Sequence, residues 1–209
     1  MDDTGTVELV VVRHGQSAWN VESRFTGQVD VPLSEQGVHQ ADALARRCAG
    51  WGIGAVVTSD LRRAYDTGLA VTRELGLAEP LRLEVLRERW STTLQGLSRD
   101  DIEARFPGQL AAWREARAVS LPGENEEYAA FAARITQGLR QAALPGSARV
   151  LVVAHAGVFV VLDQLLGEET AGGVGNAEGR RVRVLGDGTL VPGDAVRLDE
   201  ATRTSVQDP

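Results

Sequence analysis

The sequence predicts an α/β protein: a single-domain, three-layer α/β/α sandwich with a mostly parallel sheet and an antiparallel C-terminal edge strand. Short apolar runs alternate with helical patterns along the 209 residues, as in strands joined by crossover helices. The run at residues 149–154 is apolar without a break after Arg149, which indicates a strand buried on both faces. Near the C-terminus, Gly186, Asp187 and Gly188 separate two extended patterns, which predicts a hairpin.

Local signals define the individual elements. Ser34 is a favourable N-cap for a helix whose apolar residues share one face. Gly76 ends the next helix, and Pro107 separates two short helical stretches. In chain order we expect a strand at residues 7–12, a helix at 34–48, a strand at 55–58, a helix at 61–75, a short strand at 81–85, helices at 98–106, 108–117 and 124–144, a strand at 149–154, a helix at 157–166, and a hairpin with strands at 180–185 and 190–191.

Composition bounds the domain and its partners. We expect one domain over residues 1–198 and a polar tail at residues 199–209, because 43% hydrophobic residues can build one sizeable core. The formal charge of −7, from 22 basic and 29 acidic residues, argues against nucleic acid or an anionic membrane surface as a partner. An edge strand near residues 180–185 would be open to pairing and permits a homodimer.

The compartment is inferred from cysteine usage and hydropathy. Cys48 is the one cysteine, so no intrachain disulfide can form, and a cytoplasmic location is the simplest interpretation. Cys48 lies in a helical pattern and is interpreted as a packing residue. No segment reaches the roughly 18 apolar residues of a membrane span, and the acidic start at residues 1–3 is unlike a signal peptide.

Charged and imidazole side chains follow four predicted strands at the point where each ends. Arg13-His14-Gly15 follows the first strand and residues 58–63 the second. Residues 86–89 follow the third, and His155-Ala156-Gly157 the fourth. Because ligands of open α/β sheets bind at the carboxyl edge of the strands, we expect these groups to share a pocket. Adjacent arginine and histidine suggest an anion, above all a phosphate.

Each of these residues also has a plainer structural interpretation. Taken alone, His14 is more often a hydrogen-bonded polar group than a nucleophile, Arg63 a solvated helix residue and Glu88 a surface carboxylate. His155 alone favours neither interpretation, and His39 is interpreted as structural. The occurrence of four such groups at strand ends favours a shared functional site.

Six motifs in order along residues 7–166 carry a family resemblance. They are VRHGQSAWN at residues 12–20, RFTGQVD at 24–30, LSEQG at 33–37, TSDLRRAYDT at 58–67, LRER at 86–89 and AHAG at 154–157. This set resembles the histidine phosphatase superfamily, also called the phosphoglycerate mutase-like family. The resemblance implies that family's α/β fold and an enzyme whose partner is a small-molecule phosphate ester.

The resemblance also implies a role for each matching residue. By position, the family's catalytic set corresponds to His14 as covalent nucleophile, Arg13 and Arg63 as phosphate-clamping arginines, His155 as the second histidine on the phosphoryl oxygens, and Glu88 as proton donor. The positions that bind substrate correspond to Gln16, Asn20, Thr26, Gly27, Ala156 and Gly157.

These residue types suit cleavage of a phosphomonoester. A neutral imidazole nitrogen of His14 can attack phosphorus, and a hydrogen bond from its other nitrogen to a carbonyl near Gly15 would select that tautomer. Guanidinium and imidazole donors meet the charge that develops on the equatorial oxygens. Glu88 can protonate the leaving alkoxide and then deprotonate water. We expect no metal and no other cofactor, because the arginines neutralise the charge and the acidic residues are scattered.

Three functions remain open. A phosphatase is favoured over a mutase because the chain passes from about residue 117 to 124 with little room for the mutases' usual insert, and because Gln16 replaces their usual glutamate. Residues 17–20 and 94–97 look more like the mutases. A non-catalytic phosphoryl-binding domain is disfavoured by the presence of all five key groups. One departure concerns the turn after Glu88, where residues 89–93 lack the family's glycine, so we expect this turn to differ.

Overall fold

Four parallel strands form the centre and one side of the sheet. A computed structural model of the protein describes residues 5–115, 122–123, 125–167 and 173–196. Its six strands lie in the order β3-β2-β4-β1-β5-β6. β1, β2, β3 and β4 run parallel, and β5 and β6 are antiparallel to their neighbours. The bounds are β1 (Val7–Arg13), β2 (Ala55–Thr58), β3 (Leu81–Arg82), β4 (Arg149–Ala154), β5 (Gly179–Val184) and β6 (Leu190–Val196).

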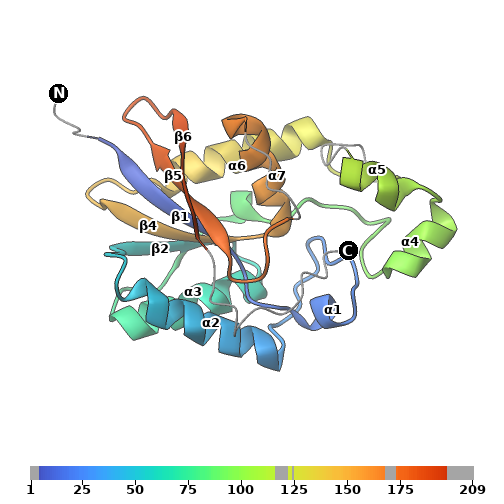
Figure 1. Ribbon diagram of the computed structural model, residues 1–209, viewed down its shortest axis with the longest axis horizontal. Helices are drawn as coiled ribbons and strands as arrows, with labels where there is room; N and C mark the ends of the chain where they lie inside the picture. The colour runs from blue at the N-terminus through green and yellow to red at the C-terminus, as the bar shows by residue number, and fades with distance from the viewer. Residues whose placement is uncertain (1–4, 116–121, 124, 168–172, 197–209) are drawn as a thin grey trace.

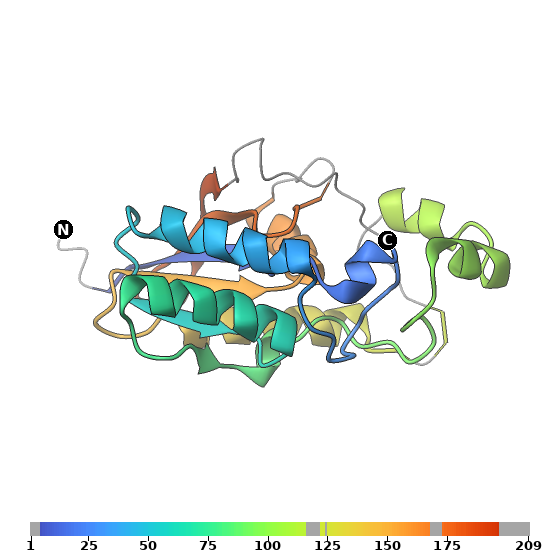
Figure 2. The same cartoon turned by 90° about the horizontal axis from the view of Figure 1, so that it is seen from below.

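Helices cover both faces of this sheet. Helices α2 (Glu35–Cys48) and α3 (Arg62–Leu75) lie on one face, and α6 (Tyr128–Ala142) and α7 (Ala156–Leu166) lie on the other (Figures 1 and 2). Alternate residues of β1 pack into two separate cores: one contains Leu9 with residues of α6 and α7, the other Val10 with residues of α2 and α3. Both faces of β1 and β4 are buried, which accounts for the unbroken apolar runs at residues 9–12 and 150–154. The three-layer α/β/α prediction is confirmed.

A cap of short helices lies beyond the carboxyl ends of β1 and β4. It consists of α1 (Ala18–Val21), α4 (Arg99–Arg105) and α5 (Gln109–Glu115), which gather at one end of the molecule (Figures 1 and 2). The cap has its own small apolar cluster, in which Leu94 and Ile102 are fully buried. This apolar cluster is separate from the two cores that stabilise the sheet.

Most predicted element boundaries agree with the structure within a residue or two. Ser34 caps α2 by accepting a hydrogen bond from the Gly37 N–H, and Gly76 ends α3 with φ of 65°. One short helix was not predicted: α1 forms in the polar loop after β1, where Ser17 and Asn20 make a capping box. The end of the 108–117 helix and the tail at residues 199–209 lie outside the described residues.

Two predicted elements are shorter in the structure. The strand expected at 81–85 ends at Arg82 and gives way to a 3₁₀ turn, η1 (Glu84–Leu86), which buries Leu86 in the core. The helix expected from residue 124 begins at Tyr128. Residues 125–127 are extended instead, because Glu126 N–H donates to the Trp90 carbonyl over 3.0 Å and Asn125 forms a β-bridge with Ser91.

The prediction that residues 180–185 form an exposed edge is wrong. β5 pairs with β1 on one side and β6 on the other, because β6 is longer than the expected 190–191 strand. The edge strand on this side of the sheet is β6, which contains Pro192 and lies across a register shift from β5. Proline and irregular register both discourage strand addition. Within the described residues, no helix is both long enough and apolar enough to cross a membrane.

Candidate active site

Strand register brings two histidines together at the carboxyl edge of the sheet. Arg13 and Ala154, the last residues of β1 and β4, are paired, and His14 N–H donates to the Ala154 carbonyl over 3.0 Å. The next residues are therefore neighbours: the ring centroids of His14 and His155 lie 5.2 Å apart at an angle of 62°. Both side chains are buried. The parallel pairing of β1 with β4 thus produces this contact across 141 residues of sequence.

Hydrogen bonds determine the tautomer of His14. Nε of Arg63 lies 3.2 Å from Nε2 of His14, and Nδ1 of His14 lies 2.6 Å from the Gly15 carbonyl oxygen. An arginine N–H can only donate, so Nε2 must carry the lone pair. The proton is then on Nδ1, where it is donated to the carbonyl. This arrangement leaves an unprotonated nitrogen facing a guanidinium.

Burial and positive neighbours keep both imidazoles neutral near pH 7. The pKa of His14 is held well below 6.5 by burial, then by the charges of Arg63 and Arg13, against a smaller opposing effect of the Gly15 carbonyl. Burial and Arg63 likewise lower the pKa of His155 well below its ordinary value. Burial lowers the pKa of Arg63 to about 10, partly offset by Glu88, so that this guanidinium stays charged.

Backbone carbonyls hold the two buried arginines. Arg63 donates to the carbonyls of Gly27 and Val29 over 2.8 and 2.9 Å, and Arg13 donates to that of Val174 over 2.9 Å. Gly27 has φ of 50°, and a side chain there would overlap Gln95. Gly27 therefore serves the site through its carbonyl, which orients Arg63.

Both ring nitrogens of His155 have hydrogen-bonding capacity that no described residue uses. Its exposed fraction is 0%, and neither ring nitrogen has a hydrogen-bond partner among the described residues. A buried unpaired polar group costs about 1–3 kcal/mol. An unpaired buried side chain such as His155 calls for a functional explanation, and a bound anion would supply its hydrogen-bond partner.

Glu88 lies at the N-terminus of α7, the helix whose N-cap is His155. Its Oε2 accepts a hydrogen bond from Gly157 N–H over 3.0 Å, and its Oε1 accepts one from Arg89 N–H over 2.7 Å. A Cβ at position 157 would overlap Oε1 of Glu88. Gly157 is thus needed for the close approach of the carboxylate, and Ala156, the first residue of α7, stands between Gly157 and His155.

Three predicted substrate-binding side chains have local partners that hold the loop after β1. Oε1 of Gln16 accepts from the Ser34 hydroxyl over 2.8 Å, and Oδ1 of Asn20 accepts from Ser17 N–H over 3.0 Å. The Thr26 hydroxyl lies 3.5 Å from the Arg24 carbonyl, at the limit of hydrogen bonding. These contacts give the three residues a structural role in the loop.

Two further residues support the site and were missed from the sequence. The Thr67 hydroxyl accepts from Gly15 N–H over 3.0 Å and donates to the Arg63 carbonyl over 2.7 Å. Nδ2 of Asn176 donates to the His14 carbonyl over 3.0 Å. Thr67 could have been found, because it lies four residues after Arg63 on the same helix face. Asn176 carries no comparable local signal.

Fold and geometry define an α/β protein in which two buried arginines lie beside two neutral histidines at the carboxyl edge of the sheet. Among the described residues, no group of three or more His, Cys, Asp or Glu side chains is placed to hold a metal ion. The chain belongs to the histidine phosphatase superfamily (branch 1), whose model matches residues 9–182. The predicted family is confirmed, and the chain is an enzyme of this superfamily, either a phosphatase or a mutase.

Known relatives include both kinds of enzyme. A glucosyl-3-phosphoglycerate phosphatase of Mycobacterium tuberculosis is 38% identical over 185 residues, covering 81% of this chain and 82% of that protein. A 2,3-bisphosphoglycerate-dependent phosphoglycerate mutase of Methylobacterium radiotolerans is 40% identical over 169 residues, covering 75% and 79%. The structure of a mycobacterial glucosyl-3-phosphoglycerate phosphatase with VO3 superposes with a TM-score of 0.76 at 36% identity, covering 84% and 90%.

Proposed function

We propose that this protein is a phosphomonoester hydrolase that acts on a small phosphorylated metabolite through a phosphohistidine on His14. The observation that carries the proposal is the tautomer of His14: its unprotonated Nε2 faces Arg63, and its Nδ1 proton is held by the Gly15 carbonyl. A nucleophile needs a lone pair, and the neighbouring guanidiniums and His155 supply donors for the phosphoryl oxygens.

The reaction proceeds in two steps. Nε2 of His14 attacks phosphorus, an N–P bond forms, the ester P–O bond breaks, and the leaving oxygen takes a proton from Glu88. Water then attacks phosphorus and gives a proton to the Glu88 carboxylate while the N–P bond breaks. Inorganic phosphate leaves, and neutral His14 and protonated Glu88 are restored.

Charge pairing at the edge of the sheet supports hydrolysis of a monophosphate. Arg62 forms an ion pair with Asp66, and Arg87 forms ion pairs with Asp60 and Glu84. These carboxylates neutralise cations that a second phosphate group of a bisphosphate would otherwise use. The few residues between the helices that the sequence predicts, from about residue 117 to 124, support the same choice.

A mutase is the second candidate, because a phosphoglycerate mutase is 40% identical to this chain. Product analysis separates the two activities. With 3-phosphoglycerate, a hydrolase releases inorganic phosphate, whereas a mutase supplied with 2,3-bisphosphoglycerate converts it to 2-phosphoglycerate. We expect phosphate release from a panel that includes 3-phosphoglycerate, glucosyl-3-phosphoglycerate and p-nitrophenyl phosphate.

The test of the mechanism compares His14→Ala with His39→Ala, a control in which the replaced histidine is exposed on α2. We expect His14→Ala to lose turnover and acid-labile phosphate labelling, and His39→Ala to keep both. Wild-type turnover by His14→Ala would refute the phosphohistidine. Tight phosphate binding by the wild type with no turnover across the panel would instead indicate a non-catalytic phosphoryl-binding domain.

A further inference from the structure

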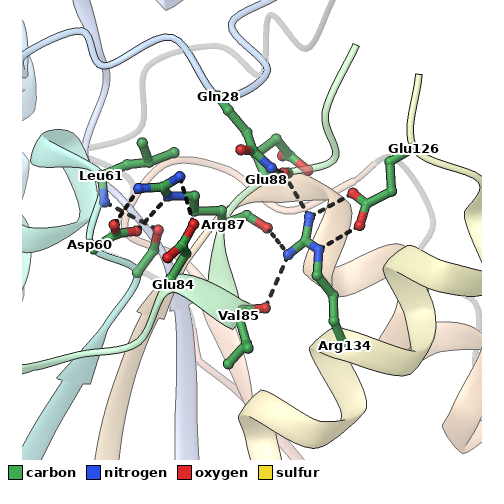
Figure 3. Close-up of polar contacts among 10 residues, drawn as sticks. Gln28, Asp60, Leu61, Glu84, Val85, Arg87, Glu88, Glu126 and Arg134 are labelled. Carbon is green, nitrogen blue, oxygen red and sulfur yellow. Dashed lines mark hydrogen bonds and ion pairs between the residues drawn. The ribbon is translucent and has the colours of Figure 1, made fainter. Parts of the chain in front are cut away.

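The segment that carries Glu88 has no helix or strand of its own. η1 ends at Leu86, and residues 87–90 have no regular secondary structure. The backbone position of Glu88 must therefore be set by contacts with other elements. Figure 3 shows these contacts: the side chains of Gln28 and Arg134 converge on carbonyls of this segment, and Glu126 pairs with Arg134.

Arg134, on α6, makes most of these contacts. Its NH1 donates to the carbonyls of Val85 and Arg87 over 3.0 and 2.6 Å, and its NH2 donates to that of Glu88 over 2.9 Å. The Glu126 carboxylate accepts from Nε and NH2 over 2.6 and 2.7 Å (Figure 3). A guanidinium has five N–H donors, so all of them are engaged.

Further bonds hold the same segment from either side. Nε2 of Gln28 donates to the Glu88 carbonyl over 2.9 Å. Oε2 of Glu126 accepts from Trp90 N–H over 3.3 Å, so the carboxylate that orients Arg134 also holds the chain just after Glu88. The Arg134–Glu126 pair thus contacts the backbone on both sides of Glu88, and the side chains of both residues are largely buried.

We propose that Arg134, oriented by Glu126, is a positioning residue that holds Glu88 where it protonates the leaving group. This inference rests on the proposed hydrolase function. One planar guanidinium fork thus holds the three carbonyls of Val85, Arg87 and Glu88. Lysine cannot reproduce that fork, since its ammonium is a point charge without the five fixed donors.

The role predicts an effect that depends on the leaving group. p-Nitrophenolate departs without a proton, whereas an alkoxide needs one, so a misplaced acid slows phosphoryl transfer to His14 from the alkyl ester only. Hydrolysis of the phosphohistidine, in which Glu88 acts as base, is common to both esters, so the comparison uses kcat/KM, which reports the first step. Displacement of a catalytic group by about 1 Å can cost about 10²-fold. We therefore expect Arg134→Lys and Arg134→Gln to lower kcat/KM for benzyl phosphate by about 10²-fold and for p-nitrophenyl phosphate by less than about threefold.

Arg140→Gln is the matched control. Arg140 lies on the same helix and its Nε also donates to a backbone carbonyl, that of Gly188, far along the chain from Glu88. We expect it to leave the ratio of the two rates unchanged. Should the Arg134 variants unfold, Glu126→Gln keeps Arg134 and its carbonyl contacts, and we expect a smaller shift of the ratio in the same direction.

A double variant decides whether Arg134 acts through Glu88. In Glu88→Gln, adding Arg134→Gln should cause no further loss on benzyl phosphate. Equal losses on the two esters, or additive losses in the double variant, would overturn the positioning role while the hydrolase function stands. If the wild type shows no turnover of either ester that depends on His14, the proposed function itself fails, and this inference with it.

Discussion

Nε of Arg63 donates to Nε2 of His14 over 3.2 Å, and both side chains are buried. This contact joins a cation to the atom that we propose as the nucleophile. It can form only while Nε2 is unprotonated, so the arginine and the Gly15 carbonyl together select one tautomer. A phosphate group that reaches Nε2 of His14 would also contact the Arg63 guanidinium. Arg63 would therefore both select the tautomer of the nucleophile and neutralise the charge of the phosphate.

The first prediction follows from that contact. Replacing Arg63 with alanine should lower kcat/KM for p-nitrophenyl phosphate by about 10²–10³-fold, equivalent to about 3–4 kcal/mol, because an electrostatic donor is lost from a buried site. Arg63→Lys should recover little, because an ammonium is a point charge without the planar fork through which Arg63 bonds two carbonyls and His14. The control is Arg62→Ala, since this neighbour is exposed and contacts Asp66. Similar losses for the two alanine variants would contradict the prediction.

The second prediction concerns the approach of Glu88 to α7. Gly157→Ala would place a Cβ against Oε1 of Glu88 and 3.0 Å from Phe131. We expect kcat on benzyl phosphate to fall by about 10²-fold because the carboxylate is displaced. Gly50→Ala is the control, since a Cβ there meets nothing within 4 Å. Both rates are measured alongside thermal unfolding, and an unchanged rate in Gly157→Ala would show that the carboxylate does not need this position.

The third prediction is a dependence of stability on pH. The pKa values of His14 and His155 are held well below 6.5 by burial and by nearby arginines, so below pH 6.5 the unfolded chain binds protons that the native state does not. The free energy of unfolding should therefore fall as pH drops below 6.5, by at most about 1.4 kcal/mol per pH unit for each histidine.

Urea unfolding between pH 7.5 and 5 measures this dependence. The double variant His14→Asn, His155→Asn should lose much of the slope below pH 6.5, because its side chains at these positions do not titrate. A slope equal to that of the wild type would mean that other groups cause the loss of stability in acid.

The fourth prediction concerns Cys48. The side chain is fully buried, and burial raises the pKa of its thiol to about 12. Since the thiolate is the reactive form, native protein should not react with a chromogenic disulfide reagent, and one thiol should react after unfolding in urea. Rapid modification of native protein would show that the packing around Cys48 opens.

Much of the fold could be predicted because its signals are local. Strands β2 and β4 have the predicted bounds, since a fully buried strand is a short apolar run between turn residues. The boundaries that failed depend on distant partners: residues 125–127 are extended because they bond to residues 90–91. β5 was mistaken for an edge because β6 continues beyond the predicted second strand of the hairpin.

The amino-acid sequence alone determined that His14 and His155 follow two buried strands, and therefore that they share one edge of a parallel sheet. Only the tertiary structure decided which nitrogen of His14 holds the proton and what holds Glu88 in place. The physical reason is the separation in sequence between the interacting residues. Strand and cap signals act over a few residues, whereas the bonds from Arg134 to Glu88 and from Asn176 to His14 join residues 46 and 162 positions apart. Such contacts exist only once the sheet has brought its strand ends together.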